Sequence, residues 1–228
     1  MKRCGWNRLS WLNTSWEARE HPKGDPTEER LGGYNTRLAQ NVGLAWRMTE
    51  LALVRHGTTE WNSLGILQGQ TDVPLSRAGR AEIIGLAEEV KGMGFEAIYC
   101  SDLLRARQSA MAFSVLLDLP VCLDPRLREI SLGIWEGLTG WQVQELYPRE
   151  WTESGLDGAP GGERLSQVAL RMGAVADEVA EAHPTGRVLI VGHGTALKTL
   201  ICQAEGRPLS GLNFDSFPNA SLHLIRWG

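Results

Sequence analysis

The sequence predicts an α/β fold, a three-layer sandwich in which a mostly parallel sheet carries helices on both faces. Short apolar runs alternate along the chain with helical stretches, which is the pattern of parallel strands joined by crossover helices. Because most of these runs are apolar throughout rather than at every second position, both faces of the sheet should be covered. The composition is that of a globular chain, since 43% of the residues are hydrophobic and 22% are charged.

The predicted strands begin just after Met48. They are residues 50–54, 97–100, 121–123, 188–191 and 221–225. The last one alternates apolar and polar residues, whereas the others are continuous apolar runs. The first and the fourth are each followed by a glycine-containing turn, which indicates where each strand ends.

The predicted helices fill the intervals between these strands. They run from residue 77 to about 91, from 101–102 to about 117, from 163 to about 182 and from 195 to about 205. Ser76 suits the N-cap of the first helix, and Ser101 and Asp102 are predicted to cap the second. The pair His183-Pro184 and then Gly206 predict the ends of the last two helices.

Residues 1–47 differ in composition from the rest of the chain. They hold four of the nine tryptophans, and eight Lys or Arg against five Asp or Glu, whereas residues 48–228 hold fifteen against twenty-two. They show no sustained periodicity, and residues 21–26 read as a loop. We therefore expect a poorly ordered N-terminal extension ahead of a catalytic domain at 48–228. The alternative is an arm or extra helix that docks through its tryptophans.

Charge, cysteine and hydropathy patterns argue against several classes of function. The formal net charge of -4 argues against a nucleic-acid binder. None of the four cysteines forms a C-x-x-C pair, so no zinc knuckle or disulfide framework is expected. No apolar run reaches the length of about 18 residues that would suggest a membrane span. We expect a cytoplasmic protein without a nucleic-acid or membrane partner, and the sequence is compatible with a homodimer.

One local pattern occurs twice and marks the predicted site. Residues 51–58 (LALVRHGT) and 188–195 (VLIVGHGT) both read as strand, His, Gly, Thr and then helix. The carboxyl ends of parallel strands share one edge of a sheet, so His56 and His193 should meet there. Arg105 falls in the first turn of the helix after the second strand and can point into the same cleft. Each glycine allows close approach of a ligand, and each helix start attracts anions.

These residue types favour a phosphate site over a metal site. Two histidines and a carboxylate could bind zinc, but the permanent charges of Arg55 and Arg105 would repel a divalent cation. Guanidinium groups instead suit the bidentate recognition of phosphate. We therefore expect no metal and no cofactor. A neutral imidazole can act as the nucleophile, and a carboxylic acid should protonate the departing alkoxide. The pattern alone does not say which histidine attacks.

Five ordered blocks resemble the histidine phosphatase superfamily, in its phosphoglycerate mutase-like branch. The blocks are 53–62 (LVRHGTTEWN), 75–79 (LSRAG), 101–110 (SDLLRARQSA), 127–129 (LRE) with 133–137 (GIWEG), and 191–194 (VGHG). The resemblance covers essentially all of residues 48–228 and none of residues 1–47. It implies a phosphoglycerate mutase-like fold.

The resemblance also implies a catalytic role for each pocket residue. His56 would be the nucleophile that takes the phosphoryl group. Arg55, Arg105 and His193 would hold the phosphate oxygens and stabilise the charge of the transition state. Glu129 would protonate the leaving oxygen and then help to activate the water that releases phosphate.

Substrate binding is predicted to involve Asn62 and Gly194 as well, and the reaction is predicted to be hydrolysis. A mutase tends to cover its phosphohistidine with a longer insertion, whereas here only about residues 138–162 form a lid. Within the resemblance, residues 133–137 and 160–163 look like those of phosphatases. The lid residues expected to set specificity, or else simply to pack, are Trp141, Tyr147, Arg149 and Trp151.

The expected substrate is the phosphomonoester of a small metabolite, of the sugar phosphate, phosphoglycerate, phosphoserine or ribazole phosphate class. The alternatives are phosphoryl transfer of the phosphoglycerate mutase type and a phosphate-binding scaffold without catalysis.

Overall fold

The described part of the chain is built on one sheet. The computed structural model describes residues 48–154, 157, 159–212 and 217–228. Its strands are β1 (Thr49–Arg55), β2 (Ala97–Cys100), β3 (Val121–Leu123), β4 (Arg187–Gly192) and β5 (Leu222–Trp227). They lie in the order β3-β2-β4-β1-β5, and β5 runs antiparallel to β1 while the other pairs are parallel. The predicted extension 1–47 lies outside the described residues.

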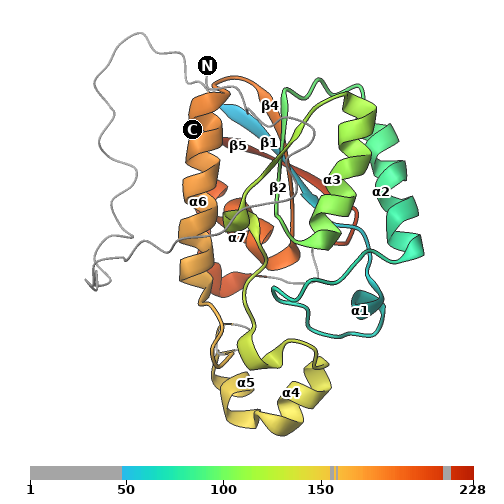
Figure 1. Ribbon diagram of the computed structural model, residues 1–228. Coiled ribbons are helices and arrows are strands. Elements are labelled where there is room, and N and C mark those ends of the chain that lie inside the picture. Colours follow the sequence, from blue (N-terminus) through green and yellow to red (C-terminus); the bar gives the residue numbers. More distant parts are fainter. Residues whose placement is uncertain (1–47, 155–156, 158, 213–216) are drawn as a thin grey trace, which may run out of the picture. The chain divides into compact units, whose positions relative to one another are not determined.

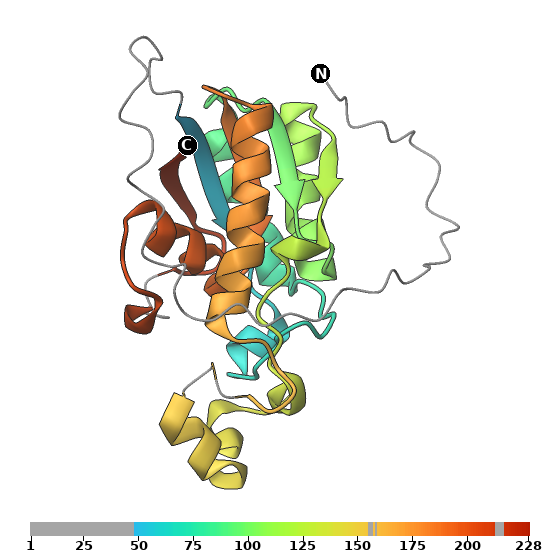
Figure 2. The same cartoon turned by 90° about the vertical axis from the view of Figure 1, so that its left-hand side faces the viewer.

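Helices cover both faces of this sheet. They are α1 (Glu60–Ser63), α2 (Arg77–Val90), α3 (Leu104–Leu117), α4 (Gly140–Leu146), α5 (Pro148–Ser154), α6 (Leu165–Ala182) and α7 (Gly194–Ala204). Three short 3-10 turns are η2 (Pro125–Leu127), η3 (Gly133–Trp135) and η5 (Leu209–Gly211). Figures 1 and 2 show α6 and α7 on one side of the sheet and α2 and α3 on the other. The predicted three-layer α/β sandwich is confirmed.

The two central strands are buried on both faces, which explains their continuous apolar sequences. One set of side chains packs with α6 and α7, namely Leu51, Leu53, Val188 and Ile190. The alternate set packs with α2 and α3, namely Ala52, Val54, Leu189 and Val191. Each large aliphatic side chain buried in this way contributes about 1.5–3 kcal/mol. These two cores hold β1 and β4 side by side. They thereby also position the turns that follow the two strands.

The N-cap of α2 is confirmed, whereas the predicted cap of α3 is wrong. The hydroxyl of Ser76 accepts from the amide of Gly79 at 2.9 Å, as a helix cap does. α3 begins only at Leu104, and the amide of Leu104 donates to the carboxylate of Asp72 at 2.5 Å. Because a distant aspartate satisfies this helix start, Ser101 and Asp102 are available for other contacts.

The predicted lid forms two short helices, and part of it packs. The rings of Trp135 and Trp151 lie with centroids 5.8 Å apart, and Tyr147 packs against the core below α6 and α7. Trp141 of α4 is 69% exposed. The aromatic residues of this segment therefore divide into packing residues and one surface tryptophan. Along the described ranges, none of the helices has the length and apolarity that crossing a membrane requires.

Candidate active site

The two histidines of the repeated motif lie side by side because their strands are neighbours in register. Arg55 at the end of β1 pairs with Gly192 at the end of β4. His56 and His193, one residue further along, have ring centroids 5.2 Å apart. Both are buried, with exposed fractions of 3% and 0%. The predicted meeting of the two rings at one edge of the sheet is confirmed.

The hydrogen bonds of His56 leave one ring nitrogen free to react. Its Nδ1 lies 2.8 Å from the carbonyl oxygen of Gly57, which can only accept, so Nδ1 carries the proton and Nε2 carries a lone pair. Asn219 Nδ2 donates to the backbone oxygen of His56 at 3.0 Å. Burial, together with the charges of Arg105 and Arg55, holds the pKa of His56 well below its usual value. The ring is therefore neutral at neutral pH.

His193 is held through its opposite nitrogen. Its Nε2 lies 2.8 Å from Ser101 Oγ, and the same oxygen accepts from the amide of Leu103 at 3.3 Å. Ser101 is fully buried, so a hydroxyl that accepted from both groups would leave its own hydrogen unpaired. Donation from Ser101 to Nε2 avoids this and places the ring proton on Nδ1. Nδ1 is buried and has no hydrogen-bond partner among the described residues.

Burial also governs the charge of His193. Desolvation, followed by the charges of Arg105 and other neighbours, holds its pKa well below the usual value. Both rings of the pair are therefore uncharged at neutral pH. Nδ1–H of His193 is then a neutral donor on the ring next to His56.

Arg105 and Arg55 bring permanent positive charge to the same place. Arg105 is 1% exposed and donates to the backbone oxygens of Thr71 and Gly69 at 2.8 and 2.7 Å. Arg55 donates to the backbone oxygen of Phe217 at 2.6 Å. In both arginines Nε is buried without a partner among the described residues. Burial lowers the pKa of Arg105 to about 10, so it stays charged at neutral pH.

The charge balance of these arginines suits an anion. Neither forms an ion pair with a carboxylate within the described ranges, and the charge of Glu129 only partly opposes the lowering of both arginine pKa values by burial. Gly194 lets Arg55 lie against the start of α7, because a Cβ there would stand 3.3 Å from the Arg55 Cζ. Arg55 and Arg105 therefore supply positive charge and two Nε–H donors that have no partner among the described residues.

Glu129 lies at the N-terminal end of α7. Its carboxylate accepts from the amides of Thr195, Ala196 and Ile130 at 3.1, 3.0 and 2.9 Å. Thr195 and Ala196 stand in the first turn of α7, directly after His193. The structure therefore brings the predicted acid to the helix start that carries the second histidine.

Asn62 makes hydrogen bonds within the loop that follows β1. Its Oδ1 accepts from the amide and the hydroxyl of Thr59, both at 3.0 Å, and completes the capping box of α1. Asn219 Nδ2 lies 3.4 Å from the same oxygen and links it to His56. Binding of a substrate by Asn62 stays a prediction, because its contacts here orient the loop after β1.

Three supporting residues escaped the sequence reasoning. Ser101 holds His193, and Asn219 holds the backbone of His56. Ser109 Oγ accepts from the amide of Gly57 at 3.1 Å and donates to the backbone oxygen of Arg105 at 2.8 Å. Ser101 and Ser109 lie within the block 101–110, so a search for hydroxyls near Arg105 could have found them. Nothing in the sequence around Asn219 marks it.

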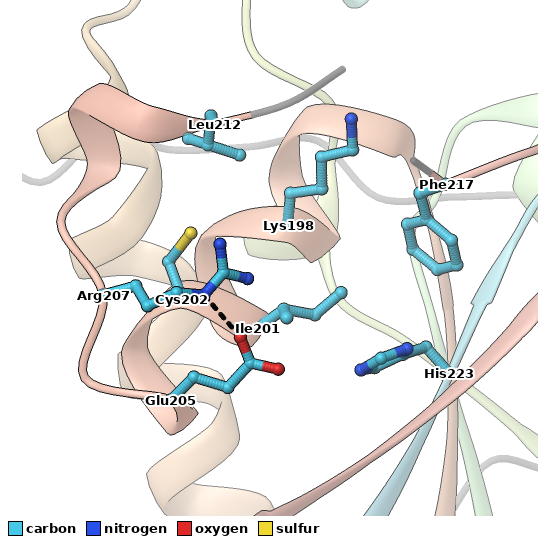
Figure 3. A pocket seen from close by; sticks show the side chains of 8 residues that line it. All are labelled: Lys198, Ile201, Cys202, Glu205, Arg207, Leu212, Phe217 and His223. Carbon is cyan, nitrogen blue, oxygen red and sulfur yellow. Dashed lines mark hydrogen bonds and ion pairs between the residues drawn. The ribbon is translucent and has the colours of Figure 1, made fainter. Parts of the chain in front are cut away.

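Other features of the described residues do not compete with this site. Within those ranges no three side chains of His, Cys, Asp or Glu come together as metal ligands. A separate hollow of about 180 Å³ lies beside α7 (Figure 3), smaller than the roughly 300–1,000 Å³ of common small-molecule sites. It is lined by Lys198, Ile201, Cys202, Glu205, Arg207, Leu212, Phe217 and His223. None of the predicted site residues lines it.

Relatives with known names fall into two functional groups. A Yersinia enterocolitica protein named "Probable phosphoglycerate mutase GpmB" is 34% identical over 168 residues, which is 71% of this chain and 77% of that protein. A mycobacterial glucosyl-3-phosphoglycerate phosphatase complexed with VO3 is 31% identical with a TM-score of 0.69, over 77% of this chain and 90% of that one. A phosphoserine phosphatase mutant from Entamoeba histolytica, in complex with phosphoserine, is 28% identical with a TM-score of 0.67, over 79% and 96%.

The match to a family model covers more than three quarters of the chain. Residues 51–228 match the model of the histidine phosphatase superfamily (branch 1). This range contains all of the predicted site residues and the sheet apart from the first two residues of β1. The five sequence blocks, the paired histidines and the structural neighbours agree with that match. The chain belongs to the histidine phosphatase superfamily, branch 1.

Proposed function

We propose that this protein hydrolyses the phosphomonoester of a small metabolite through a phosphohistidine on His56. The observation that carries the proposal is the opposite anchoring of two buried rings. His56 offers a lone pair at Nε2, and His193 offers a proton at Nδ1, beside Arg55 and Arg105. A nucleophile, a neutral donor and two cations around one point suit a tetrahedral phosphoryl group.

In the first step His56 takes the phosphoryl group. The lone pair of Nε2 forms a bond to phosphorus while the bond from phosphorus to the ester oxygen breaks. Arg55, Arg105 and His193 Nδ1–H hold the three non-bridging oxygens, and Glu129 gives its proton to the departing oxygen. The Nδ1–H of His56 keeps its bond to Gly57 and stabilises the positive charge that forms on the ring.

In the second step water releases the phosphate. The carboxylate of Glu129 takes a proton from a water molecule, whose oxygen attacks phosphorus. The bond from phosphorus to Nε2 breaks and its electron pair returns to the ring. Inorganic phosphate leaves, Glu129 is protonated again and His56 is ready for another cycle. Two cationic side chains supply the charge that a metal supplies in other phosphatases, so the chemistry needs no metal.

The second candidate is phosphoryl transfer of the phosphoglycerate mutase type, and the names of several sequence relatives favour it. The 34% identical Yersinia protein carries that name, whereas the structural neighbours with substrate-specific names are phosphatases. Both reactions use the same phosphohistidine. They differ in whether water or a second hydroxyl accepts the phosphoryl group. The substrate class therefore remains the one expected from the sequence, a small phosphorylated metabolite.

A substrate panel tests the proposal. The full chain is incubated with sugar phosphates, phosphoserine and 3-phosphoglycerate, and released phosphate is measured with and without a chelator. We expect turnover that the chelator leaves unchanged and that vanadate, a mimic of five-coordinate phosphorus, inhibits. Rapid conversion of 3-phosphoglycerate to 2-phosphoglycerate with a bisphosphoglycerate primer, without net phosphate release, would establish the mutase instead.

A further inference from the structure

Arg171 of α6 makes an unusually complete set of hydrogen bonds close to the predicted acid. Its Nε and Nη2 donate to the two carboxylate oxygens of Glu163, both at 2.9 Å. Its Nη1 donates to the backbone oxygens of Arg126 and Arg128, both at 2.6 Å. Nη2 also donates to the backbone oxygen of Glu129 at 3.0 Å. The side chain is 17% exposed, so these bonds lie largely out of water.

Glu163 extends this hydrogen-bond network to the residues that follow Glu129 in the chain. Its Oε2 accepts from the amide of Ser131 at 2.9 Å and from Gln70 Nε2 at 3.3 Å. Gln70 Nε2 also donates to the backbone oxygen of Glu129 at 3.1 Å. The segment 126–131 is thus tied to α6 before, at and after Glu129. This segment contains only one short 3-10 turn, so the side chains of Arg171, Glu163 and Gln70 supply the bonds that a helix or strand would supply.

The position of the backbone decides where the carboxylate can reach. From this fixed main chain the Glu129 carboxylate spans to the amides of Thr195 and Ala196 at the start of α7. An acid that protonates a leaving oxygen must stand within hydrogen-bond distance of it, and a displacement of about 1 Å can cost on the order of 10²-fold in rate. Loss of the ties to segment 126–131 would permit such a displacement.

We propose that Arg171 is a positioning residue for Glu129: it ties the backbone of residues 126–129 to Glu163 and so places the carboxylate for proton transfer to the leaving group. The inference rests on the proposed function, because it assumes that Glu129 is the acid. Arg171 is not assigned any contact with the substrate. Its loss should therefore act mainly on the proton-transfer step. Because its charge is also among those that lower the pKa of His193, the variant that keeps the charge, Arg171→Lys, isolates that step.

A comparison of two leaving groups tests this inference. An alkyl ester such as glycerol phosphate leaves as an alkoxide and needs a proton, whereas 4-nitrophenyl phosphate leaves as a stable phenolate and does not. The value of kcat/KM reports only the steps up to release of the alcohol, so the later hydrolysis of phosphohistidine does not enter. For Arg171→Met we expect kcat/KM to fall on the order of 10²-fold with glycerol phosphate and less than about tenfold with 4-nitrophenyl phosphate.

Two companion variants sharpen the test. Arg171→Lys keeps the charge but lacks the planar fork that reaches three carbonyl oxygens, so it should show the same preference for the aryl ester. If Arg171→Met does not fold, Arg171→Lys provides the same test. The matched control is Arg126→Met. That side chain is 41% exposed and pairs with Asp124 and Glu178, and its loss leaves the backbone bonds of Arg171 in place. It should weaken both reactions equally or not at all.

The outcomes separate the inference from the proposed function. Equal losses with both esters, or no loss with either, in Arg171→Met and Arg171→Lys would overturn the positioning role. Combination with Glu129→Gln gives a second measurement, since Arg171→Met should cost little more once the acid is absent. Full additivity would also overturn it. His56→Ala should abolish turnover of both esters, and activity that survives this change would instead refute the proposed function.

Discussion

The turns after β1 and β4 share one sequence pattern and end as different chemical groups. Both place a buried histidine one residue beyond neighbouring strands. After β1, Nδ1 of His56 is held by the carbonyl of Gly57, and Nε2 is left as a lone pair. After β4, Nε2 of His193 is held by Ser101, and Nδ1 is left as a donor. The partner of the bonded nitrogen, and not the motif, decides whether each ring can attack or can donate.

The chain also continues differently from the two turns. α7 begins directly at Gly194, so His193 is the N-cap of a long helix whose first amides hold Glu129. After His56 only the short α1 follows, and the loop is held by Asn219 and by the capping box of Asn62. The first turn therefore presents one ring nitrogen with a lone pair, and the second places a donor next to the helix start that holds Glu129. Four predictions test this division of roles.

The largest difference in kcat is expected between the variants that lack the His56 ring and the His193 ring. His56→Ala should lower kcat on the order of 10⁵-fold because the nucleophile is lost. His193→Ala should lower it by about 10²–10³-fold, because one donor to the transition state is lost while the nucleophile remains. Steady-state kinetics on the best substrate of the panel measure both. His193→Ala protein should still form the phosphoenzyme; a larger loss in His193→Ala than in His56→Ala would reverse the assigned roles.

Replacement by alanine should lower the stability of the protein at Gly57 and its activity at Gly194. At Gly57 an added Cβ would stand 2.3 Å from the backbone oxygen of Gly79, so Gly57→Ala should lower the free energy of unfolding by about 2–3 kcal/mol. At Gly194 the Cβ would stand 3.3 Å from the Arg55 guanidinium, so Gly194→Ala should keep stability but lower kcat/KM by displacing Arg55.

Urea denaturation and kinetics of the same proteins separate these effects. Gly85→Ala is the matched control, because that Cβ would meet open space on α2 and should raise stability by about 0.5–1 kcal/mol. Equal stability losses in Gly57→Ala and Gly194→Ala would show that both glycines serve packing alone.

Removal of the Ser101 hydroxyl tests what sets the proton position in His193. In Ser101→Ala the Nε2 of His193 loses its partner, so the proton is free to move between the ring nitrogens. We expect kcat/KM to fall about tenfold, the effect of one lost hydrogen bond of about 1.4 kcal/mol. The ¹⁵N shifts of His193 should show a protonated Nδ1 in the parent protein and a mixture in the variant. A protonated Nε2 in the parent protein would be incompatible with this assignment.

The smallest effect is expected in the pH dependence of stability. The pKa values of both histidines lie well below the value of about 6.5 for an unfolded histidine. Between these limits the unfolded chain binds more protons than the folded one, so stability is present above about pH 6.5 and is lost as the pH falls. Chemical denaturation at about pH 7.5 and about pH 5.5 should show a smaller loss for His193→Gln than for the parent protein.

The exposed His223 provides the control for this measurement. His223→Gln should lose as much stability on acidification as the parent protein does. If His193→Gln lost as much as the parent protein, burial of an uncharged His193 would not be the cause of the acid sensitivity.

Local patterns predicted the sheet, because the strands other than β5 are continuous apolar runs, and β1 and β4 are buried on both faces. The same patterns predicted the meeting of His56 and His193, since both follow strands that are neighbours in a parallel sheet. The start of α3 was wrong for a reason that local sequence does not carry. Asp72, far from α3 in the chain, satisfies the amide of Leu104, and no capping residue is needed nearby.

Arg171 and Asn219 were beyond prediction because they act across long separations. Arg171 reaches three carbonyl oxygens more than forty positions earlier in the chain. Asn219 reaches His56 from the segment before β5. A side chain that bonds to backbone oxygens leaves no motif, since every residue offers such an oxygen. The nucleophile could be assigned from the family resemblance, but its free nitrogen became visible only with the bond to Gly57.

The phosphorylated nitrogen is the most direct test of the account. The enzyme is mixed with substrate, quenched in alkali during turnover and digested, and the phosphopeptide is identified by mass spectrometry and by ³¹P spectra of the two phosphohistidine isomers. We expect phosphate on Nε2 of His56, in the parent protein and in His193→Ala. Phosphate on His193, on Nδ1 of His56 or in an acid-stable ester of a hydroxyl group would contradict this assignment.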